Sequence, residues 1–261
     1  MDLQVNNNLG TKIRIIPVIL WEGMSSVKGE SFNSWRKLGP INPAVNIYIA
    51  RNVDEIILLN VLPNKKNVGI DFNSIRKIFE KSNLPLAYGG GVRSISDVEN
   101  LLHCGVDKVI FGTAAYENTE LIKHCIELYG SQFVVLSVDY KKIKNEFVCF
   151  SNNGKINQEI NALDHIIKMY DLGIGEVMIT NIDFEGHMRG YDIDLLEKIR
   201  PMLDIPIIIN GGAGNSVNHF EQAINAGADA VAASSTFLFT EITPKKVAKY
   251  LNDIGKNTRI N

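Results

Sequence analysis

Short apolar runs recur along the whole chain, and polar, amphipathic stretches separate them. The runs are rich in Val, Ile, Leu and Ala, and they are too uninterrupted for strands with one face in water. Strands that are buried on both faces have this composition, which indicates a parallel sheet. The eight runs are Arg14–Leu20, Glu55–Asn60, Leu84–Tyr88, Lys108–Gly112, Phe133–Asp139, Glu176–Ile182, Ile205–Asn210 and Ala230–Ser234.

Amphipathic segments, with apolar positions three or four residues apart, lie between these runs. Examples are the segments near Ser74 and Ser96, and Glu120–Tyr129, Asn161–Leu172, Asp194–Met202, Val217–Ala226 and Thr243–Ile254. Eight strands that alternate with about as many helices in 261 residues predict one α/β domain, a single (β/α)8 TIM barrel spanning residues 1–261. The alternative is a doubly wound open sheet, which usually has fewer strands.

The same order of motifs occurs in both halves of the chain. Gly89–Gly91 closes an apolar run that opens on a proline, and Gly211–Gly214 closes a second run of the same kind. A Gly-x-Asp-x-Val strand follows each turn at equal spacing, beginning at Gly105 and at Gly227. This duplication predicts a half-barrel of four βα units that is repeated once, and it favours the barrel over the open sheet.

Glycines and hydroxyl groups end four of the predicted strands. Function in such a barrel lies at the carboxyl ends of the strands, where bare backbone N–H groups form cradles for anions. Two symmetry-related cradles would hold a ligand with a phosphate at each end, although any single turn is explained as well by tight turning. The predicted phosphate-binding residues are Gly90, Gly91, Thr113, Gly212, Gly214 and Ser234, with Lys28 as an added contact or a solvated surface charge.

Two carboxylates follow predicted strands and are candidates for acid/base catalysis. Asp139 ends an apolar strand, so its side chain would face the barrel mouth, and partial burial would raise its pKa. The alternative for Asp139 is a helix cap or an ion pair with Lys141 or Lys142. Asp183 follows the sixth strand, and a turn-forming role explains it almost as well.

Composition excludes several classes of function. A net charge of −2 gives no bulk attraction to nucleic acid or to an anionic membrane. Cys104, Cys125 and Cys149 are too few and too scattered for a disulfide framework, and they are expected to be buried thiols. No metal site or cofactor is predicted, and neither a signal peptide nor a membrane span is present, so we expect a cytoplasmic protein. Residues 1–11 are expected to be flexible and residues 255–261 frayed.

A series of short motifs resembles the cyclase subunit of imidazole glycerol phosphate synthase from about Lys12 to Leu251. That family has the barrel fold, binds phosphates at both glycine turns and needs no cofactor. The Gly-Ser-Gln and Gly-x-Gly-Glu segments favour the cyclase over the related phosphoribosyl isomerase. The motifs are Arg14-Ile15-Ile16-Pro17, Val27-Lys28-Gly29, Asp54-Glu55-Ile56, Gly89-Gly90-Gly91-Val92-Arg93, Asp107-Lys108-Val109, Gly130-Ser131-Gln132, Gly175-Glu176-Val177, Gly190-Tyr191-Asp192, Gly211-Gly212-Ala213-Gly214 and Glu241-Ile242-Thr243.

The resemblance implies a protein partner. In the family, a glutaminase docks at the amino-terminal face of the barrel, and its ammonia passes through the barrel core to the substrate. A ring of four charged side chains gates the entrance, and its members fall on Arg14, Glu55, Lys108 and Glu176. Asp107 and Gln132 are expected near the same face, at the partner interface. Buried charges are costly unless they are paired, so the four ring members are expected to neutralise one another.

The predicted active site departs from the family pattern. The family uses two aspartates, and the position of the first falls on Leu20 while Asp139 matches the second. The strand-2 aspartate falls on Asn60, and an asparagine of strand 4 falls on Gly112. The chain is therefore similar to a branch of paralogues encoded with surface-polysaccharide genes, which lack the first aspartate.

This branch is thought to supply ammonia for acetamidino sugars, together with a glutaminase and a sugar amidotransferase. The resemblance thus implies a phosphorylated or nucleotide-linked sugar intermediate as the substrate. Two alternatives remain: true cyclase activity in histidine biosynthesis, and a non-catalytic conduit for ammonia.

Overall fold

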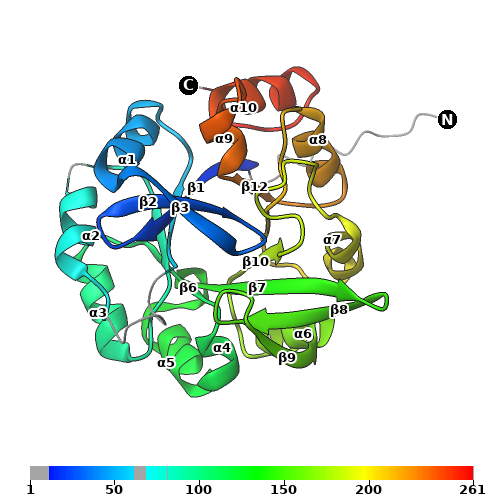
Figure 1. Ribbon diagram of the computed structural model, residues 1–261. Helices are drawn as coiled ribbons and strands as arrows, with labels where there is room; N and C mark the ends of the chain where they lie inside the picture. The colour runs from blue at the N-terminus through cyan, green and yellow to red at the C-terminus, as the bar shows by residue number, and fades with distance from the viewer. Residues whose placement is uncertain (1–11, 62–68, 81, 261) are drawn as a thin grey trace.

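The computed structural model describes residues 12–61, 69–80 and 82–260, and a closed barrel of parallel strands forms its centre (Figure 1). Within these residues the eight barrel strands coincide with the eight predicted runs, so the predicted (β/α)8 barrel is confirmed and the open sheet is excluded. The last strand pairs with the first in parallel register, Arg14 opposite Ala230. In order round the barrel the strands are β1 (Arg14–Glu22), β4 (Ile56–Asn60), β5 (Leu86–Gly89), β6 (Lys108–Phe111), β7 (Val134–Ile143), β10 (Glu176–Asn181), β11 (Ile207–Asn210) and β12 (Ala230–Ala233).

Helices surround the barrel and cover its outer face (Figure 1). The α-helices are α1 (Ile41–Ala50), α2 (Phe72–Phe79), α3 (Ile95–His103), α4 (Ala114–Glu117), α5 (Thr119–Tyr129), α6 (Ala162–Asp171), α7 (Asp194–Ile199), α8 (Asn218–Asn225), α9 (Ser235–Phe239) and α10 (Pro244–Asp253), with 3-10 turns η1 (Ser131–Phe133) and η2 (Arg200–Met202). Sequence periodicity did not identify α1. Among the described residues, no helix combines the length and the apolar character that crossing a membrane requires.

Two antiparallel hairpins, which the sequence analysis missed, extend the barrel strands at the mouth. β2 (Ser25–Glu30) pairs with the end of β1 and with β3 (Asn33–Pro40). β8 (Glu146–Ser151) pairs with the extended end of β7 and with β9 (Ile156–Asn161). The Asn152-Asn153-Gly154 turn between β8 and β9 is a hairpin signal that could have been used.

Alternate residues of the barrel strands point into the barrel, as the strand period of two requires. The inward residues of β1 between its ends are Ile16, Val18 and Leu20, and they belong to an apolar cluster separate from the core between strands and helices. Val135 of β7 lies in the same cluster, which places Ser137 and Asp139 inward on the same strand. The interior is therefore apolar in its middle and polar at the carboxyl ends of the strands.

The two halves of the chain share backbone geometry as well as sequence motifs. Gly90 and its counterpart Gly212 have φ angles of 104° and 98°. In the first half, Leu86 donates its backbone N–H to the carboxylate of Asp107 at 2.8 Å, and in the second half Ile207 donates to Asp229 at 2.9 Å. The structure thus supports the duplication predicted from the sequence.

The described part of the carboxyl-terminal tail, residues 255–260, contacts the rest of the protein through Thr258, whereas a frayed tail over residues 255–261 was expected. Thr258 is 5% exposed, forms a parallel bridge with Ile13 and donates its hydroxyl to the carbonyl of Ala248 at 2.8 Å. The tail is held because it pairs with the start of β1 and packs on α10, contacts that its polar sequence did not indicate. The predicted flexible N-terminus, residues 1–11, lies outside the described residues.

Candidate active site

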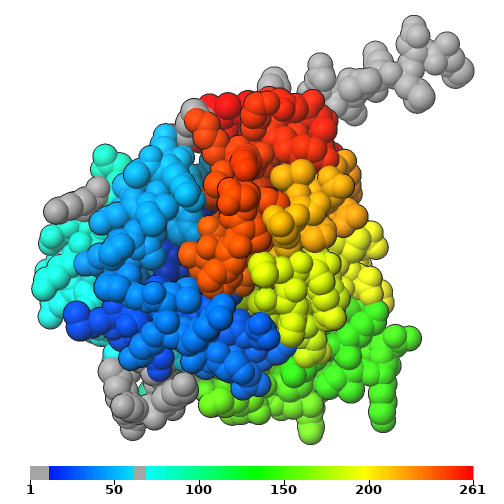
Figure 2. Space-filling view, turned by 45° about the horizontal axis from the view of Figure 1, so that its top comes forward, coloured from blue at the N-terminus to red at the C-terminus, as the bar shows by residue number. Residues whose placement is uncertain are grey.

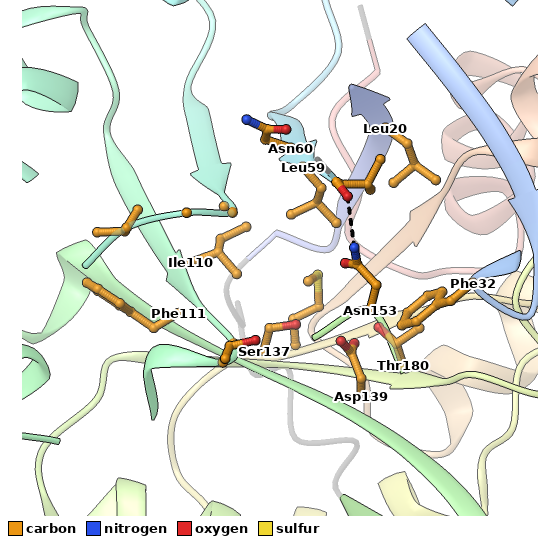
Figure 3. A pocket seen from close by; sticks show the side chains of 18 of the residues that line it. Leu20, Phe32, Leu59, Asn60, Ile110, Phe111, Ser137, Asp139, Asn153 and Thr180 are labelled. Carbon is orange, nitrogen blue, oxygen red and sulfur yellow. Dashed lines mark hydrogen bonds between the residues drawn. The ribbon is translucent and has the colours of Figure 1, made fainter. Parts of the chain in front are cut away.

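A pocket of about 220 Å³ lies at the carboxyl ends of the barrel strands (Figure 3). Its floor is formed by inward side chains of the barrel, including Val18, Met178 and Thr180. The two hairpins supply its rim: Phe32 lies between β2 and β3, and Asn153 lies between β8 and β9 and donates to the carbonyl of Val61 at 2.8 Å. The pocket occupies the location that the barrel fold predicts for a functional site.

Asp139 brings a carboxylate into this pocket from β7 (Figure 3). Asp139 is partly exposed and lines the pocket, whose other walls surround its carboxyl group. Burial raises the pKa of Asp139 to about 7, and the negative charge of Glu185 adds to this shift. The ion pairs considered for Asp139 do not form, because Lys141 pairs with Asp183 and Lys142 with Asp194. A carboxyl group with this pKa can donate and accept a proton near neutral pH.

The wall opposite Asp139 is apolar at Leu20, the position at which the resemblance implied an aspartate. Leu20 is an inward residue near the end of β1, is 7% exposed and lines the pocket together with Leu59. Asn60 and Gly112 also line the pocket. Leu20 has no group that can transfer a proton, so an acid/base pair shared between β1 and β7 is not available in this structure.

The glycine turn after β5 lines the pocket and forms the first cradle, which we define as Gly90, Gly91 and Thr113. All three residues border the main pocket. Gly90 and Gly91 have positive φ angles, 104° and 82°, which side chains rarely adopt. The hydroxyl of Thr113 accepts a hydrogen bond from the backbone of Asn152 at 3.0 Å, and this bond connects the cradle to the second hairpin.

Substitution Gly90→Ala is expected to destabilise the barrel by about 2 kcal/mol or more, because φ is positive and the new Cβ would lie 2.2 Å from the carbonyl oxygen of Asn60. Urea unfolding followed by circular dichroism measures this change. Gly69→Ala is the matched control, since no atom of the described residues lies within 4 Å of a Cβ there. Equal stability of the two variants would contradict the tight packing of this turn.

The glycine turn after β11 has a different environment and forms the second cradle, which we define as Gly211, Gly212, Gly214 and Ser234. The N–H of Gly214 donates to a ring nitrogen of His219 at 3.1 Å, and Gly212 accepts from the N–H of Gly190 at 2.8 Å. The hydroxyl of Ser234 is buried and has no hydrogen-bond partner among the described residues. The cavity at this turn measures about 10 Å³.

Lys28 is buried beside the second cradle and does not line the main pocket. It is 2% exposed, and its ammonium group donates to a carboxylate oxygen of Glu185 at 2.5 Å. The alternative of a solvated surface charge is therefore wrong, because the β2–β3 hairpin folds Lys28 inward. Glu185, which the sequence analysis did not single out, lines both the main pocket and the small cavity of the second cradle.

Asp183, the second acid/base candidate, does not line the pocket. Its side chain is 48% exposed and forms an ion pair with Lys141 at 3.4 Å. Two residues later the chain turns, and Glu185 enters the pocket instead. The sequence offered both carboxylates in one loop, and only the packing of that loop against the β2–β3 hairpin separates their environments.

The four charged residues predicted to gate the barrel form a closed ring at its amino-terminal end. Arg14 pairs with Glu55 at 2.6 Å and also with Glu176. Lys108 pairs with Glu176 at 2.8 Å and with Glu55 at 3.3 Å. Burial by itself lowers the pKa of Arg14, but the charges of both glutamates outweigh it and raise the pKa. The expected mutual neutralisation is thus observed, with the carboxylates buried and the cations partly exposed.

An apolar layer inside the barrel separates this ring from the pocket. Ile16 and Ile57 follow the ring residues Arg14 and Glu55 along their strands and belong to the interior cluster with Val135 of β7, and the pocket begins at Val18 and Met178. Asp107 and Gln132 are exposed and precede β6 and β7, so both lie on the amino-terminal side of the barrel, as predicted.

Within the part of the chain that the structure describes, no cluster of His, Cys, Asp or Glu could hold a metal ion. The three cysteines are free and buried, as predicted.

Comparison with known proteins identifies relatives over nearly the whole chain. Residues 14–243 match the family described as "Histidine biosynthesis protein". A Campylobacter jejuni protein named "Putative imidazole glycerol phosphate synthase subunit hisF2" is 36% identical over 249 residues, which are 95% of this chain and 99% of that protein. The imidazole glycerol phosphate synthase subunit HisF of Thermobifida fusca is 35% identical over 253 residues, 95% of this chain and 98% of that protein. The HisF subunit of Dictyoglomus thermophilum is 36% identical over 243 residues, 93% of this chain and 96% of that protein.

Proposed function

The chain belongs to the histidine biosynthesis protein family of imidazole glycerol phosphate synthase HisF subunits, and from this membership we propose that it is a synthase subunit that receives ammonia from a glutaminase. The observation that carries the proposal is the complete charged ring of Arg14, Glu55, Lys108 and Glu176. A paired ring with an apolar interior behind it suits a small neutral molecule such as ammonia, and excludes ions because an unpaired charge is costly in such surroundings.

The pocket supplies the second half of the proposed function. Ammonia that passes the ring reaches a pocket in which Asp139, with a pKa of about 7, transfers protons to or from the reacting group. The first cradle, Gly90, Gly91 and Thr113, holds a phosphate of the substrate through backbone N–H groups. No metal ion or cofactor is required for this chemistry.

We further propose that the substrate is a phosphorylated or nucleotide-linked sugar in the synthesis of acetamidino sugars of a surface polysaccharide. Two observations support this choice over histidine biosynthesis: Leu20 faces the pocket in place of a carboxylate, and a hisF2 protein is among the relatives. A glutaminase and a sugar amidotransferase would then be the partners, and all would work in the cytoplasm. Asp107 and Gln132 would lie in the glutaminase interface.

Expression in a histidine auxotroph that lacks the cyclase subunit tests this choice. We expect no growth without histidine, because loss of one member of an acid/base pair costs orders of magnitude in rate. The HisF subunit of Thermobifida fusca, expressed from the same vector, is the positive control. Growth supported by this chain would contradict the polysaccharide assignment and favour the cyclase.

Purification of the native protein with its partners tests the ammonia-receiving role itself. A glutaminase is expected to copurify, and its glutamine hydrolysis is expected to rise when this chain is present. Copurification of a glutaminase without an amidotransferase would favour the cyclase. An Asp139→Asn complex that still hydrolyses glutamine but forms no product would support catalysis by this chain. Unchanged product formation in Asp139→Asn would favour the non-catalytic conduit.

A further inference from the structure

We propose that the carboxylate of Glu185 fills the second cradle, so that the ligand brings an anionic group to the first cradle only. This inference rests on the proposed function and narrows its substrate class to molecules with one terminal phosphate or similar anion. It departs from the simplest expectation of the duplicated sequence, in which two equivalent cradles grip a phosphate at each end.

The space at the two cradles is the first argument. The first cradle opens into a pocket of about 220 Å³, whereas the cavity at the second measures about 10 Å³. A cavity needs roughly 10–15 Å³ to hold one water molecule, so a phosphate group does not fit beside Gly212. Glu185 and Ser234 line both spaces, whereas Gly211 and Gly212 line only the small cavity.

The position of the Glu185 carboxylate is the second argument. One of its oxygens would lie 3.1 Å from a Cβ atom at Gly211, so the carboxylate occupies the space that the missing side chain of this glycine leaves. Its other oxygen accepts the hydrogen bond of Lys28. Lys28, which the sequence analysis considered as a phosphate contact, is therefore already neutralised by Glu185.

The backbone around Glu185 holds the carboxylate in this place. The carbonyl of Glu185 accepts a hydrogen bond from the N–H of Ser31, at the tip of the β2–β3 hairpin, at 2.9 Å. Gly186 packs so closely on the hairpin that a Cβ there would lie 2.5 Å from the carbonyl of Gly29. Figure 2 shows the blue hairpin against the yellow-green segment that contains this loop.

A phosphate at the second cradle would meet two obstacles that the first cradle lacks. It would have to displace Glu185 from Lys28, or lie beside a carboxylate of the same sign. At the first cradle Arg93 follows the glycines on the pocket wall, and the carboxylates of that wall are Glu117 of α4, Asp139 of β7 and Glu185. The two halves of the barrel therefore share their backbone but differ in the charge at their turns.

Equilibrium dialysis with radiolabelled inorganic phosphate tests the inference on the full chain. The wild-type protein is expected to bind about one phosphate, and Thr113→Val is expected to weaken that binding, while Ser234→Ala leaves it unchanged. Glu185→Ala removes the internal carboxylate and exposes Lys28, so this variant is expected to bind about two. Glu146→Ala, which removes a carboxylate of β8 that does not line the pocket, is the matched control and should bind as the wild type does.

Two phosphates bound by the wild type, or binding that depends on Ser234 and not on Thr113, would overturn the inference even if Glu185→Ala failed to fold. A folded Glu185→Ala protein that binds no additional phosphate would also overturn it. None of these outcomes bears on the delivery of ammonia, which is measured with glutamine and ammonium salts. Conversely, failure of a glutaminase to copurify would reject the proposed function without changing the phosphate count.

Discussion

Asp139→Asn is expected to lower ammonia-dependent product formation by the native complex about 10²–10⁴-fold, the range typical for removal of a general acid or base. The amide has nearly the same shape as the carboxyl group, so the pocket keeps its volume but loses its titratable group. Leu20 on the opposite wall offers no replacement. Steady-state rates with saturating ammonium salt, in the presence of the partner proteins, measure the effect.

Asp183→Asn is the comparison for this experiment. Its side chain is 48% exposed and pairs with Lys141 outside the pocket, so its removal is expected to change the rate less than about twofold. A loss at Asp183 as large as that at Asp139 would show that the loop after β10 rearranges during the reaction. Equal rates in both variants and the wild type would leave the barrel with no acid/base role.

The same Asp139→Asn variant should differ from the wild type in the pH dependence of stability. The folded-state pKa of Asp139, about 7, lies above the ordinary value of 3.8, because burial disfavours the charged carboxylate. Between these values the folded protein holds a proton that the unfolded chain releases, so stability falls as pH rises through this window. Relative to Asp139→Asn, the wild type should lose roughly 4 kcal/mol between about pH 4 and pH 8, because each pKa unit of the shift corresponds to about 1.4 kcal/mol. Urea unfolding at both pH values measures the difference, and parallel stability curves would contradict the raised pKa.

Lys108→Ala is expected to separate the two sources of ammonia. Glutamine-driven product formation should fall about tenfold or more, whereas product formation from free ammonium salt should change little. Lys108 neutralises both Glu55 and Glu176, so its loss leaves two buried carboxylates with Arg14 as their remaining partner in the ring. The repelled carboxylates would open the ring and uncouple it from the glutaminase. The two activities, measured on the same preparation, give the ratio.

A surface lysine provides the control for this variant. Lys77 is exposed on α2, and Lys77→Ala should leave the ratio of glutamine-driven to ammonia-driven activity unchanged. Lys108→Ala should also lose about 1–3 kcal/mol of stability, since the ring ion pairs are partly buried. If both activities fell by the same factor, the ring would support the fold and not the passage of ammonia.

Much of the fold follows from short-range sequence patterns. The barrel strands were predicted because residues buried on both faces form uninterrupted apolar runs, and that pattern is visible within each strand. The glycine turns at Gly90 and Gly212 were predicted for a similar reason, since a positive φ angle restricts the residue type locally. The hairpins at Phe32 and Asn153 were missed because their strands are partly exposed and their pairing depends on the neighbouring barrel strands.

The sequence by itself determined the barrel, its duplication and the carboxylate of Asp139 at the end of an apolar strand, and the family resemblance added the four members of the charged ring. Only the tertiary structure decided that Glu185, and not Asp183, enters the pocket, and that Lys28 is buried against it. Side-chain direction in a strand follows from the period of two, whereas in a loop it depends on what the loop packs against. Lys28 and Glu185 are brought together by closure of the barrel and by the β2–β3 hairpin, contacts between distant parts of the chain that no local pattern specifies.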